Sequence, residues 1–328
     1  MRRVGSAAAA VGVLVLLAAH PSAAQVEEGT FERELKVTGP VDLSVSTGSG
    51  DITVRQGKAG AVRVVGRIRA SDRWRTRSRL SAAERVRRLI EAPPIVQNGN
   101  VVRVGEIDDP DLRDGVSISY ELTVPASTRL RSRSGSGSQS IDGIDGPVDA
   151  SSGSGNLRIG AVGGEVRATA GSGSIAVEGV KGTLHASTGS GNLVAADVAG
   201  AVSVSTGSGR VEVEQTAPGD ARVRTGSGSI ILRGVNGGLD VSAGSGRIEV
   251  EGRPVRDWRL RAASGSVTLR LVGEPGFELR ARTSSGGLST THPVTVIGAV
   301  GRREIRGTVR GGGPLIDIST ASGSIRIE

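Results

Sequence analysis

Few residues in this sequence have the side chains that catalysis requires. The chain has no cysteine, which excludes thiolate nucleophiles, disulfides and cysteine-ligated zinc. Outside a predicted leader, histidine occurs only at His185 and His292, so a Ser-His-Asp triad would have to use one of these two as its base. The many serines stand in turns and do not indicate a nucleophile. We therefore predict no catalytic residue, no metal site and no cofactor.

Carboxylates remain, because some β-solenoids cleave polysaccharides with a carboxylate pair on an outer face. The acids predicted to face outward are scattered or stand beside arginine; they are Asp149, Glu178, Glu212, Glu214, Asp240, Glu249 and Glu251. Aromatic residues, which often form platforms for sugar rings, make up only 2% of the chain. A polysaccharide-active enzyme is therefore the alternative that the sequence supports least.

The segment EIDDPDLRDG, residues 106–115, carries four aspartates and suggests calcium. Its spacing misses that of an EF-hand loop by one residue, and Tyr120 stands where the bidentate glutamate should be. The segment is better explained as an exposed acidic turn.

Basic side chains form the one pattern that suggests binding. Asp149 and Asp240 interrupt this series, which occupies predicted outward positions just before glycine-rich turns. Its members are Arg131, Arg133, Arg167, His185, Arg222 and Arg224. A flat β face with regularly spaced arginines could bind an anionic glycan or a partner protein, and the competing interpretation is a solvated charged surface. The net charge of +8 fits both. Nucleic acid is not expected, because few aromatic side chains are available to stack on bases.

These positions recur because the sequence is a repeat. Gly-Ser-Gly triplets begin at Gly48, Gly135, Gly153, Gly171, Gly189, Gly207, Gly226 and Gly244, and from Gly135 onward the steps are 18 or 19 residues. Apolar residues alternate with others on both sides of each triplet, as in TLHASTGSGNLVAADVAG, which is typical of strands with one buried face. A β-sandwich would need neither a fixed period nor matched residue sizes. The sequence therefore predicts an all-β fold, a parallel β-solenoid with coils of about 18 residues.

Three segments are expected along the chain. Residues 1–24 have the charged start, apolar run and small residues of a signal peptide. Residues 25–128 form an N-terminal β segment with one short helix inserted at about 80–91, which begins with the capping pair Ser81 and Glu84. This helix would cover one end of the stack, and its arginines also allow it to lie on a membrane surface. Residues 129–328 form the Gly-Ser-Gly solenoid, with no transmembrane segment after cleavage.

The order of these parts resembles a bacterial family of β-strand-repeat domains described as candidate adhesins, domains of unknown function with Gly-Ser-Gly repeats. The resemblance rests on the early unit STGSGDITV, the arginine-rich helix before APPIVQNGNVVRVG, the strand SISYELTVP, repeats such as VSVSTGSGRVEV and the end GGGPLIDISTASGSIRIE. It covers nearly the whole chain after the leader. It implies an exported β-solenoid and brings no catalytic residues.

The sequence thus leads to an exported, non-enzymatic module that acts as an adhesin or envelope scaffold in the periplasm or at the cell surface. Its expected partner is an envelope polymer, an anionic glycan or a membrane protein. The main alternative is an accessory sensor that docks a membrane partner in envelope-stress signalling.

Overall fold

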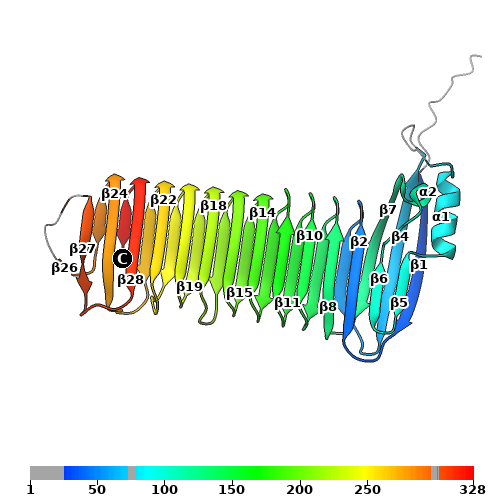
Figure 1. Cartoon of the computed structure of the whole chain (residues 1–328), viewed down its shortest axis with the longest axis horizontal. Helices are drawn as coiled ribbons and strands as arrows, with labels where there is room; N and C mark the ends of the chain where they lie inside the picture. Colours follow the sequence, from blue (N-terminus) through cyan, green and yellow to red (C-terminus); the bar gives the residue numbers. More distant parts are fainter. Residues whose placement is uncertain (1–25, 73–77, 297–300, 302) are drawn as a thin grey trace, which may run out of the picture.

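The computed structural model describes residues 26–72, 78–296, 301 and 303–328, so the predicted signal peptide lies outside the described residues. The described chain is a long stack of coils, and its strands form two sheets that run the length of the molecule (Figure 1). Successive coils pair in parallel within each sheet, which confirms the predicted β-solenoid. None of the helices in the described residues is long and apolar enough to cross a membrane.

Sheet B, the 15-stranded sheet, begins at the C-terminal end of the stack. In spatial order its strands are β26 (Thr295–Val296), β27 (Glu304–Val309), β24 (Phe277–Ser285), β28 (Leu315–Ser322), β22 (Trp258–Ser264), β20 (Leu239–Ser245), β18 (Ala221–Ser227), β16 (Val202–Ser208), β14 (Leu184–Ser190), β12 (Val166–Ala170), β10 (Val148–Ser152), β8 (Thr128–Ser134), β2 (Val41–Thr47), β6 (Val101–Val104) and β5 (Ile95–Asn98).

Sheet A, the 14-stranded sheet, begins at the N-terminal end. In spatial order its strands are β1 (Val26–Lys36), β4 (Ala61–Ser71), β7 (Val116–Val124), β3 (Ile52–Gln56), β9 (Gln139–Ile144), β11 (Leu157–Val162), β13 (Ile175–Val180), β15 (Leu193–Val198), β17 (Val211–Gln215), β19 (Ile230–Val235), β21 (Ile248–Gly252), β23 (Val267–Leu271), β29 (Ile325–Ile327) and β25 (Leu288–Thr290).

The alternation in each repeat places one row of side chains between the sheets and the other in solvent. Val202 of β16 and Val213 of β17 are buried, and both belong to one continuous core. Val202 stands directly opposite Leu184 on one neighbouring strand and Ala221 on the other. Because equivalent residues stack in register, the type of each outward residue also repeats along the sheet surface.

The Gly-Ser-Gly triplets form the corners where the chain passes from sheet B to sheet A. A Cβ atom on Gly209 would lie 2.1 Å from the carbonyl oxygen of Gly191 in the coil below, and Gly209 has a φ of +141°. Beneath the corner, Thr188 Oγ1 donates a hydrogen bond of 2.8 Å to the Gly173 carbonyl. The triplets therefore recur because each corner needs a residue without a side chain where it lies on the corner below.

We expect the Gly209→Ala substitution to destabilise the stack by about 1–3 kcal/mol from backbone strain, with a further cost from the contact to Gly191. Gly48→Ala is the matched control, because a Cβ atom there would have no heavy atom within 4 Å. Chemical denaturation of both variants measures the difference. Equal stability of the two would contradict the stacked-corner explanation.

The N-terminal end departs from the repeat. Strands β1, β4 and β7 pair antiparallel at the end of sheet A, and the hairpin of β5 and β6 ends sheet B. Helix α1 (Ala82–Glu91) packs on β1 and β4 at this end of the stack (Figure 1). A second short helix, α2 (Pro110–Arg113), lies in the acidic segment for which the sequence predicts a turn.

One face of α1 is buried against the sheet. It consists of Ala82, Arg85, Val86 and Leu89, whereas Ala83 is exposed. The Ser81 side chain accepts the Glu84 backbone N–H at 3.2 Å, which confirms the N-cap. The arginine content had suggested a membrane-surface helix, but Arg85 is fully buried and cannot contribute to such a face.

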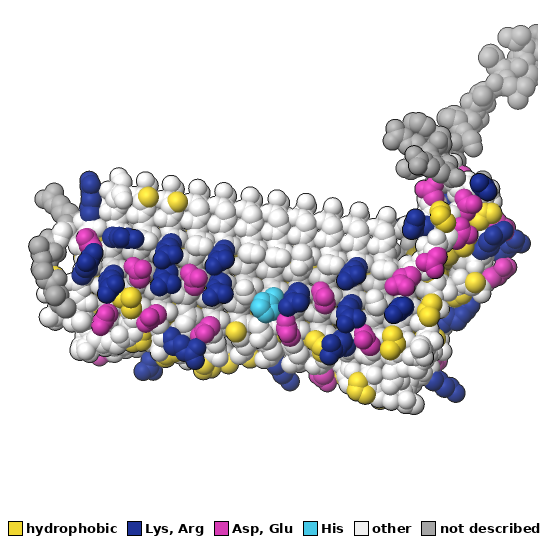
Figure 2. Space-filling model, in the orientation of Figure 1, with side chains coloured by type: hydrophobic (Ala, Val, Ile, Leu, Met, Phe, Trp, Pro, Cys, Tyr) yellow, Lys and Arg dark blue, Asp and Glu magenta, His cyan; other side chains and the backbone are white. Residues whose placement is uncertain are grey.

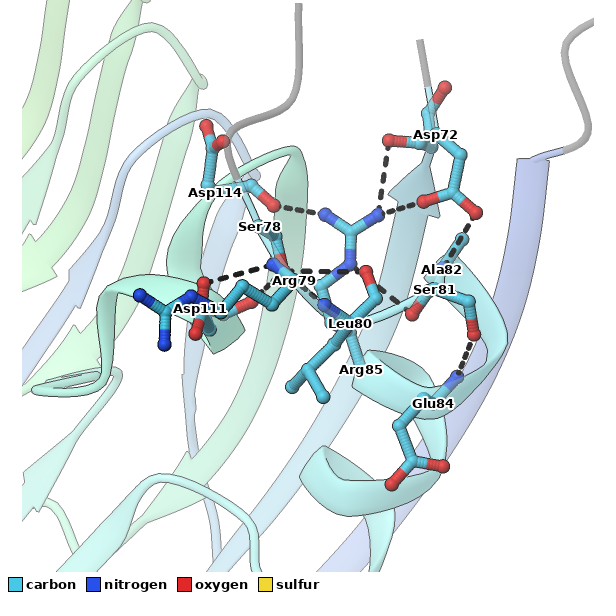
Figure 3. A network of polar contacts seen from close by, with 11 residues as sticks. Asp72, Ser78, Arg79, Leu80, Ser81, Ala82, Glu84, Arg85, Asp111 and Asp114 are labelled. Carbon is cyan, nitrogen blue, oxygen red and sulfur yellow. Dashed lines mark hydrogen bonds and ion pairs between the residues drawn. The ribbon is translucent and has the colours of Figure 1, made fainter. Parts of the chain in front are cut away.

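Arg85 joins the helix to the segments beside it (Figure 3). Its guanidinium donates to the Asp114 carbonyl oxygen and to Asp72 Oδ1, and Nη2 also donates to the Ser71 carbonyl at 3.2 Å. Asp72 Oδ2 in turn accepts the Ala82 backbone N–H at 2.8 Å. One buried cation therefore ties α1 to the ends of β4 and α2.

The C-terminal end contains an insertion of one coil between two others. Strands β28 and β29, the last in the chain, lie between the coil of β22 and β23 and the coil of β24 and β25. The chain between β25 and β28 folds back as β26 and β27, and β27 pairs antiparallel with β24 at the end of sheet B. The last coil in the sequence is therefore not the last coil in the stack.

Candidate functional site

Two rows of outward side chains run along sheet B because its strands are in register. The first row holds the residues six positions before the last glycine of each triplet or its equivalent. We call it the mixed-charge ladder, and its order from β2 to β24 is Ser44, Arg131, Asp149, Arg167, His185, Ser203, Arg222, Asp240, Arg259, Asp317 and Arg280. Like charges do not stand on adjacent strands in this row, which limits repulsion.

The second row holds the residues four positions before the same glycine. We call it the arginine–hydroxyl ladder, and its order is Ser46, Arg133, Ser151, Thr169, Ser187, Ser205, Arg224, Ser242, Arg261, Ser319 and Arg282. None of these side chains is buried. Over the described strands from β2 to β24 this row contains only arginine, serine and threonine.

The candidates from the sequence divide between the two rows. Arg131, Arg167, His185 and Arg222 lie in the mixed-charge ladder, whereas Arg133 and Arg224 lie in the arginine–hydroxyl ladder. Arg131 and Arg222 are separated by five strand spacings, about 24 Å. The structure therefore arranges the six candidates along a flat face and does not gather them into one pocket.

Several candidates have acidic neighbours. Arg167 Nη2 lies 3.3 Å from Glu165 Oε1, and His185 Nε2 lies 3.9 Å from the same oxygen. Arg131 Nη1 lies 3.7 Å from Asp42 Oδ1. These side chains are about half exposed, so water weakens the attractions and leaves the cations accessible.

At the next basic pair, one carboxylate serves two arginines. Asp240 Oδ2 lies 3.6 Å from Arg222 Nε and 3.8 Å from Arg224 Nη2. Neither distance is that of a short hydrogen-bonded pair. Arg133 has no ion-pair partner among the described residues.

Two shallow hollows lie where the sheet B strands begin. One of about 210 Å³ is lined by Arg129, Arg131, Asp149, Glu165 and Arg167 among others. The other, of about 490 Å³, includes His185, Arg222, Asp240, Arg259 and Asp317. Four of the six candidates therefore line the hollows, which could seat the backbone or ring of an extended ligand.

The sequence analysis missed four arginines of this face. Arg259 and Arg261 lie on β22, and Arg280 and Arg282 lie on β24. Figure 2 shows Lys and Arg side chains gathering over the strands at the C-terminal end of the face. The signal was present, because the same offsets of six and four residues lead back from Gly265 and Gly286 to these arginines.

The seven predicted outward acids are divided between the two sheets. Asp149 and Asp240 lie on the mixed-charge ladder of sheet B, far apart, whereas the other five lie on sheet A. On sheet A, Glu212 Oε1 accepts a hydrogen bond of 2.7 Å from Arg233 Nη1, and this bond raises the pKa of Arg233. Glu212 and Glu249 both pair with Ile231, one from each neighbouring strand, so the strand that carries Ile231 lies between them.

The acidic segment near α2 is occupied by local hydrogen bonds. Asp109 Oδ1 accepts the Asp111 backbone N–H at 2.9 Å, and Asp111 Oδ1 accepts the Arg79 backbone N–H at 3.1 Å. Within the described ranges, no group of three or more His, Asp or Glu side chains is placed to hold a metal ion.

A separate cavity of about 770 Å³ lies at the N-terminal end, between the first triplet and the β4–β7 pair. Ile107, Val116, Ile118 and Tyr120 form much of its lining, and burial raises the pKa of Tyr120. Ser46, the first residue of the arginine–hydroxyl ladder, also lines this cavity, but none of the ladder arginines does.

Comparison with known proteins places this architecture in a family. The sequence profile of the Toastrack DUF4097 family matches residues 121–328. The chain belongs to the Toastrack DUF4097 family. This toastrack segment includes β8 to β29 and therefore both ladders from Arg131 onward. Membership confirms the resemblance seen in the sequence, and the family description assigns no activity.

Two solved structures are similar to this toastrack protein. A "putative cell adhesion protein" from Clostridium sporogenes has 10% sequence identity, with 91% of this chain and 99% of that chain covered and a TM-score of 0.16. A "putative adhesin" from Bacteroides fragilis has 14% identity, with 92% and 97% covered and a TM-score of 0.22. Neither TM-score is high enough to support an argument about this chain. No curated protein matches the toastrack sequence.

Proposed function

We propose that this protein is an exported, non-enzymatic binding module of the cell envelope, an adhesin or scaffold that attaches to an anionic envelope polymer through sheet B. The observation that carries the proposal is the arginine–hydroxyl ladder, a row along the outer face of sheet B that contains cations and hydroxyl groups and no acid from Ser46 to Arg282.

A flat and regular face suits an extended polymer better than a compact molecule. The coils repeat the same outward positions at every strand, about 4.8 Å apart, so a polymer lying along the stack meets similar groups at regular intervals. Guanidinium groups bind carboxylate, sulfate and phosphate oxygens through paired N–H donors. Many weak contacts of this kind give binding that depends strongly on salt.

Export is proposed from the leader-like residues 1–24. The absence of catalysis is proposed from the lack of cysteine and from the arginine partners of carboxylates such as Glu212 and Glu249. In the alternative function, an accessory sensor, the same face would meet the acidic surface of a membrane protein. Binding to protein-free envelope polymer separates these two possibilities.

The test is co-sedimentation of the purified protein with envelope polymer freed of protein, at low and at high salt. We expect binding at low salt, release at high salt, and binding weakened roughly threefold or more by Arg131→Ser, Arg167→Ser and Arg222→Ser together. The control triple Arg55→Ser, Arg158→Ser and Arg326→Ser removes the same charge from sheet A. Equal loss in both triples, or no binding by the unaltered protein, would overturn the proposal.

A further inference from the structure

The C-terminal part of sheet B has a regular spacing of exposed arginines. Arg224, Arg261 and Arg282 stand on alternate strands of the arginine–hydroxyl ladder, with Ser242 and Ser319 between them. Two strand spacings separate successive arginines, a distance of about 9.6 Å. This order exists only because β28 lies between β22 and β24, which brings Ser319 between Arg261 and Arg282.

Most arginines in this part of the face form no close ion pair with the described residues. Arg224 shares Asp240 with Arg222, whereas no carboxylate among the described residues forms an ion pair with Arg259, Arg261, Arg280 or Arg282. The six arginines on β18, β22 and β24 face only two aspartates in the same rows, Asp240 and Asp317. Within these two rows the net charge is therefore +4, and we call their six arginines and two aspartates the C-terminal arginine patch. The nearest acids outside the rows are Asp220 and Asp257, which line a hollow with Arg222 and Arg259, Glu278 on β24, and Glu304 of β27, which stands opposite Arg282.

Hydroxyl groups border the patch. Serines at the corner end of the sheet B strands stack in register beside the arginine–hydroxyl ladder; they are Ser190, Ser208, Ser227, Ser245, Ser264, Ser322 and Ser285. All are exposed. In Figure 2 this edge of the molecule is an even row of uncharged groups. A ligand held by the arginines can therefore exchange hydrogen bonds with serine hydroxyls along its whole length.

We propose that the C-terminal arginine patch binds a linear acidic glycan that carries one anionic group per disaccharide and lies along the stack, across the strands. The proposal deepens the proposed function and rests on it. A disaccharide of an extended, β-linked chain has nearly the length of two strand spacings, so successive anions meet Arg224, Arg261 and Arg282. Sugar hydroxyls between the anions meet Ser242, Ser319 and the corner serines. The patch is recognised through charge and hydrogen bonds, because aromatic side chains are absent from both ladders.

The experiment uses hyaluronan oligosaccharides as probes, because they carry one carboxylate per disaccharide. Binding to the purified full chain is measured by titration calorimetry. We expect the hexasaccharide, whose three carboxylates reach all three arginines, to bind roughly tenfold more tightly than the tetrasaccharide. Arg224→Ser, Arg261→Ser and Arg282→Ser together should reduce hexasaccharide affinity roughly tenfold or more.

A matched variant on the other sheet serves as the control. The triple Arg55→Ser, Arg158→Ser and Arg326→Ser on sheet A removes the same charge and should change hexasaccharide affinity less than threefold. Equal losses in the two triples, no length step between the oligosaccharides, or equal binding of a polyglutamate with the same number of carboxylates would overturn the proposal. If the envelope polymer still binds while hyaluronan does not, the ligand assignment fails and the proposed function stands. If hyaluronan binds while the envelope polymer does not, the proposed attachment to the envelope fails and the glycan site at the patch stands.

Discussion

Deletion of residues 315–328, which contain β28 and β29, is expected to unfold β24 to β27. The reason is the position of β28, which pairs with β22 on one side and with β24 on the other along its whole length. Without β28, strand β24 has no parallel partner in sheet B. The hairpin of β24 and β27 then has no sheet to join, and an isolated hairpin is marginally stable in water.

Burial adds to this loss. Ile316, Ile318, Ile325 and Ile327 of the last coil are all at most 2% exposed, and each such side chain is worth about 1.5–3 kcal/mol of burial. Their removal also exposes Trp258 on the β22 side. We expect hydrogen exchange to show loss of protection in residues 277–309 and retained protection in β8 to β20.

An internal deletion is the control for this prediction. Removing residues 171–188 takes out one complete 18-residue step and joins Ala170 to Gly189, which restores an equivalent corner. In a stack of equivalent coils this longer deletion should keep the remaining coils protected, because each coil contacts only its neighbours. If residues 277–309 stay protected after loss of the last coil, or if the internal deletion is the more damaging, the role assigned to β28 is wrong.

The insertion of the last coil shows where sequence reasoning stops. The regular triplets predicted the parallel stack, since each glycine corner lies on the one before it. At the C-terminal end, Gly265, Gly286 and Gly323 stand in similar turns, and their sequence order suggests that β24 follows β22 directly. The structure instead places β28 next to β22. Three coils with equivalent patterns can be ordered in more than one way, and only the packing between non-neighbouring segments decides.

The sequence predicted which residues of the candidate site face outward, but not how its arginines are spaced. Alternation placed Arg131 and Arg224 on the outside, and both are exposed on sheet B. Arg261 and Arg282 have the same offset from their glycines, so they could have been found by counting from the last residue of each turn. Their separation by Ser319 follows from the insertion of β28 and has no signal in the local sequence. The charge spacing of the C-terminal arginine patch is therefore a property of the fold.

The burial of Arg85 likewise could not be predicted from the sequence. Its replacement should have the largest effect of any point substitution at the N-terminal end. In sequence it is one arginine in a basic run. In the structure it is 0% exposed and donates to Asp72 and to the carbonyls of Ser71 and Asp114. Arg85→Met keeps much of the volume and removes every donor. It leaves the carbonyls of Ser71 and Asp114 without these hydrogen bonds, and we expect a loss of roughly 2–4 kcal/mol in the stability of the capping segment.

Arg88→Met is the matched control on the same helix. Arg88 is about half exposed, and its Nε donates to Glu84 Oε1 at 2.8 Å, so its loss should cost no more than about 0.5 kcal/mol. Hydrogen exchange of β1 and β4, on which α1 packs, measures both variants. Protection lost in Arg85→Met and kept in Arg88→Met would show that the buried cation holds the cap. Equal protection in both would mean that contacts kept in both variants suffice, such as the packing of Val86 and Leu89 and the Ala82 hydrogen bond to Asp72.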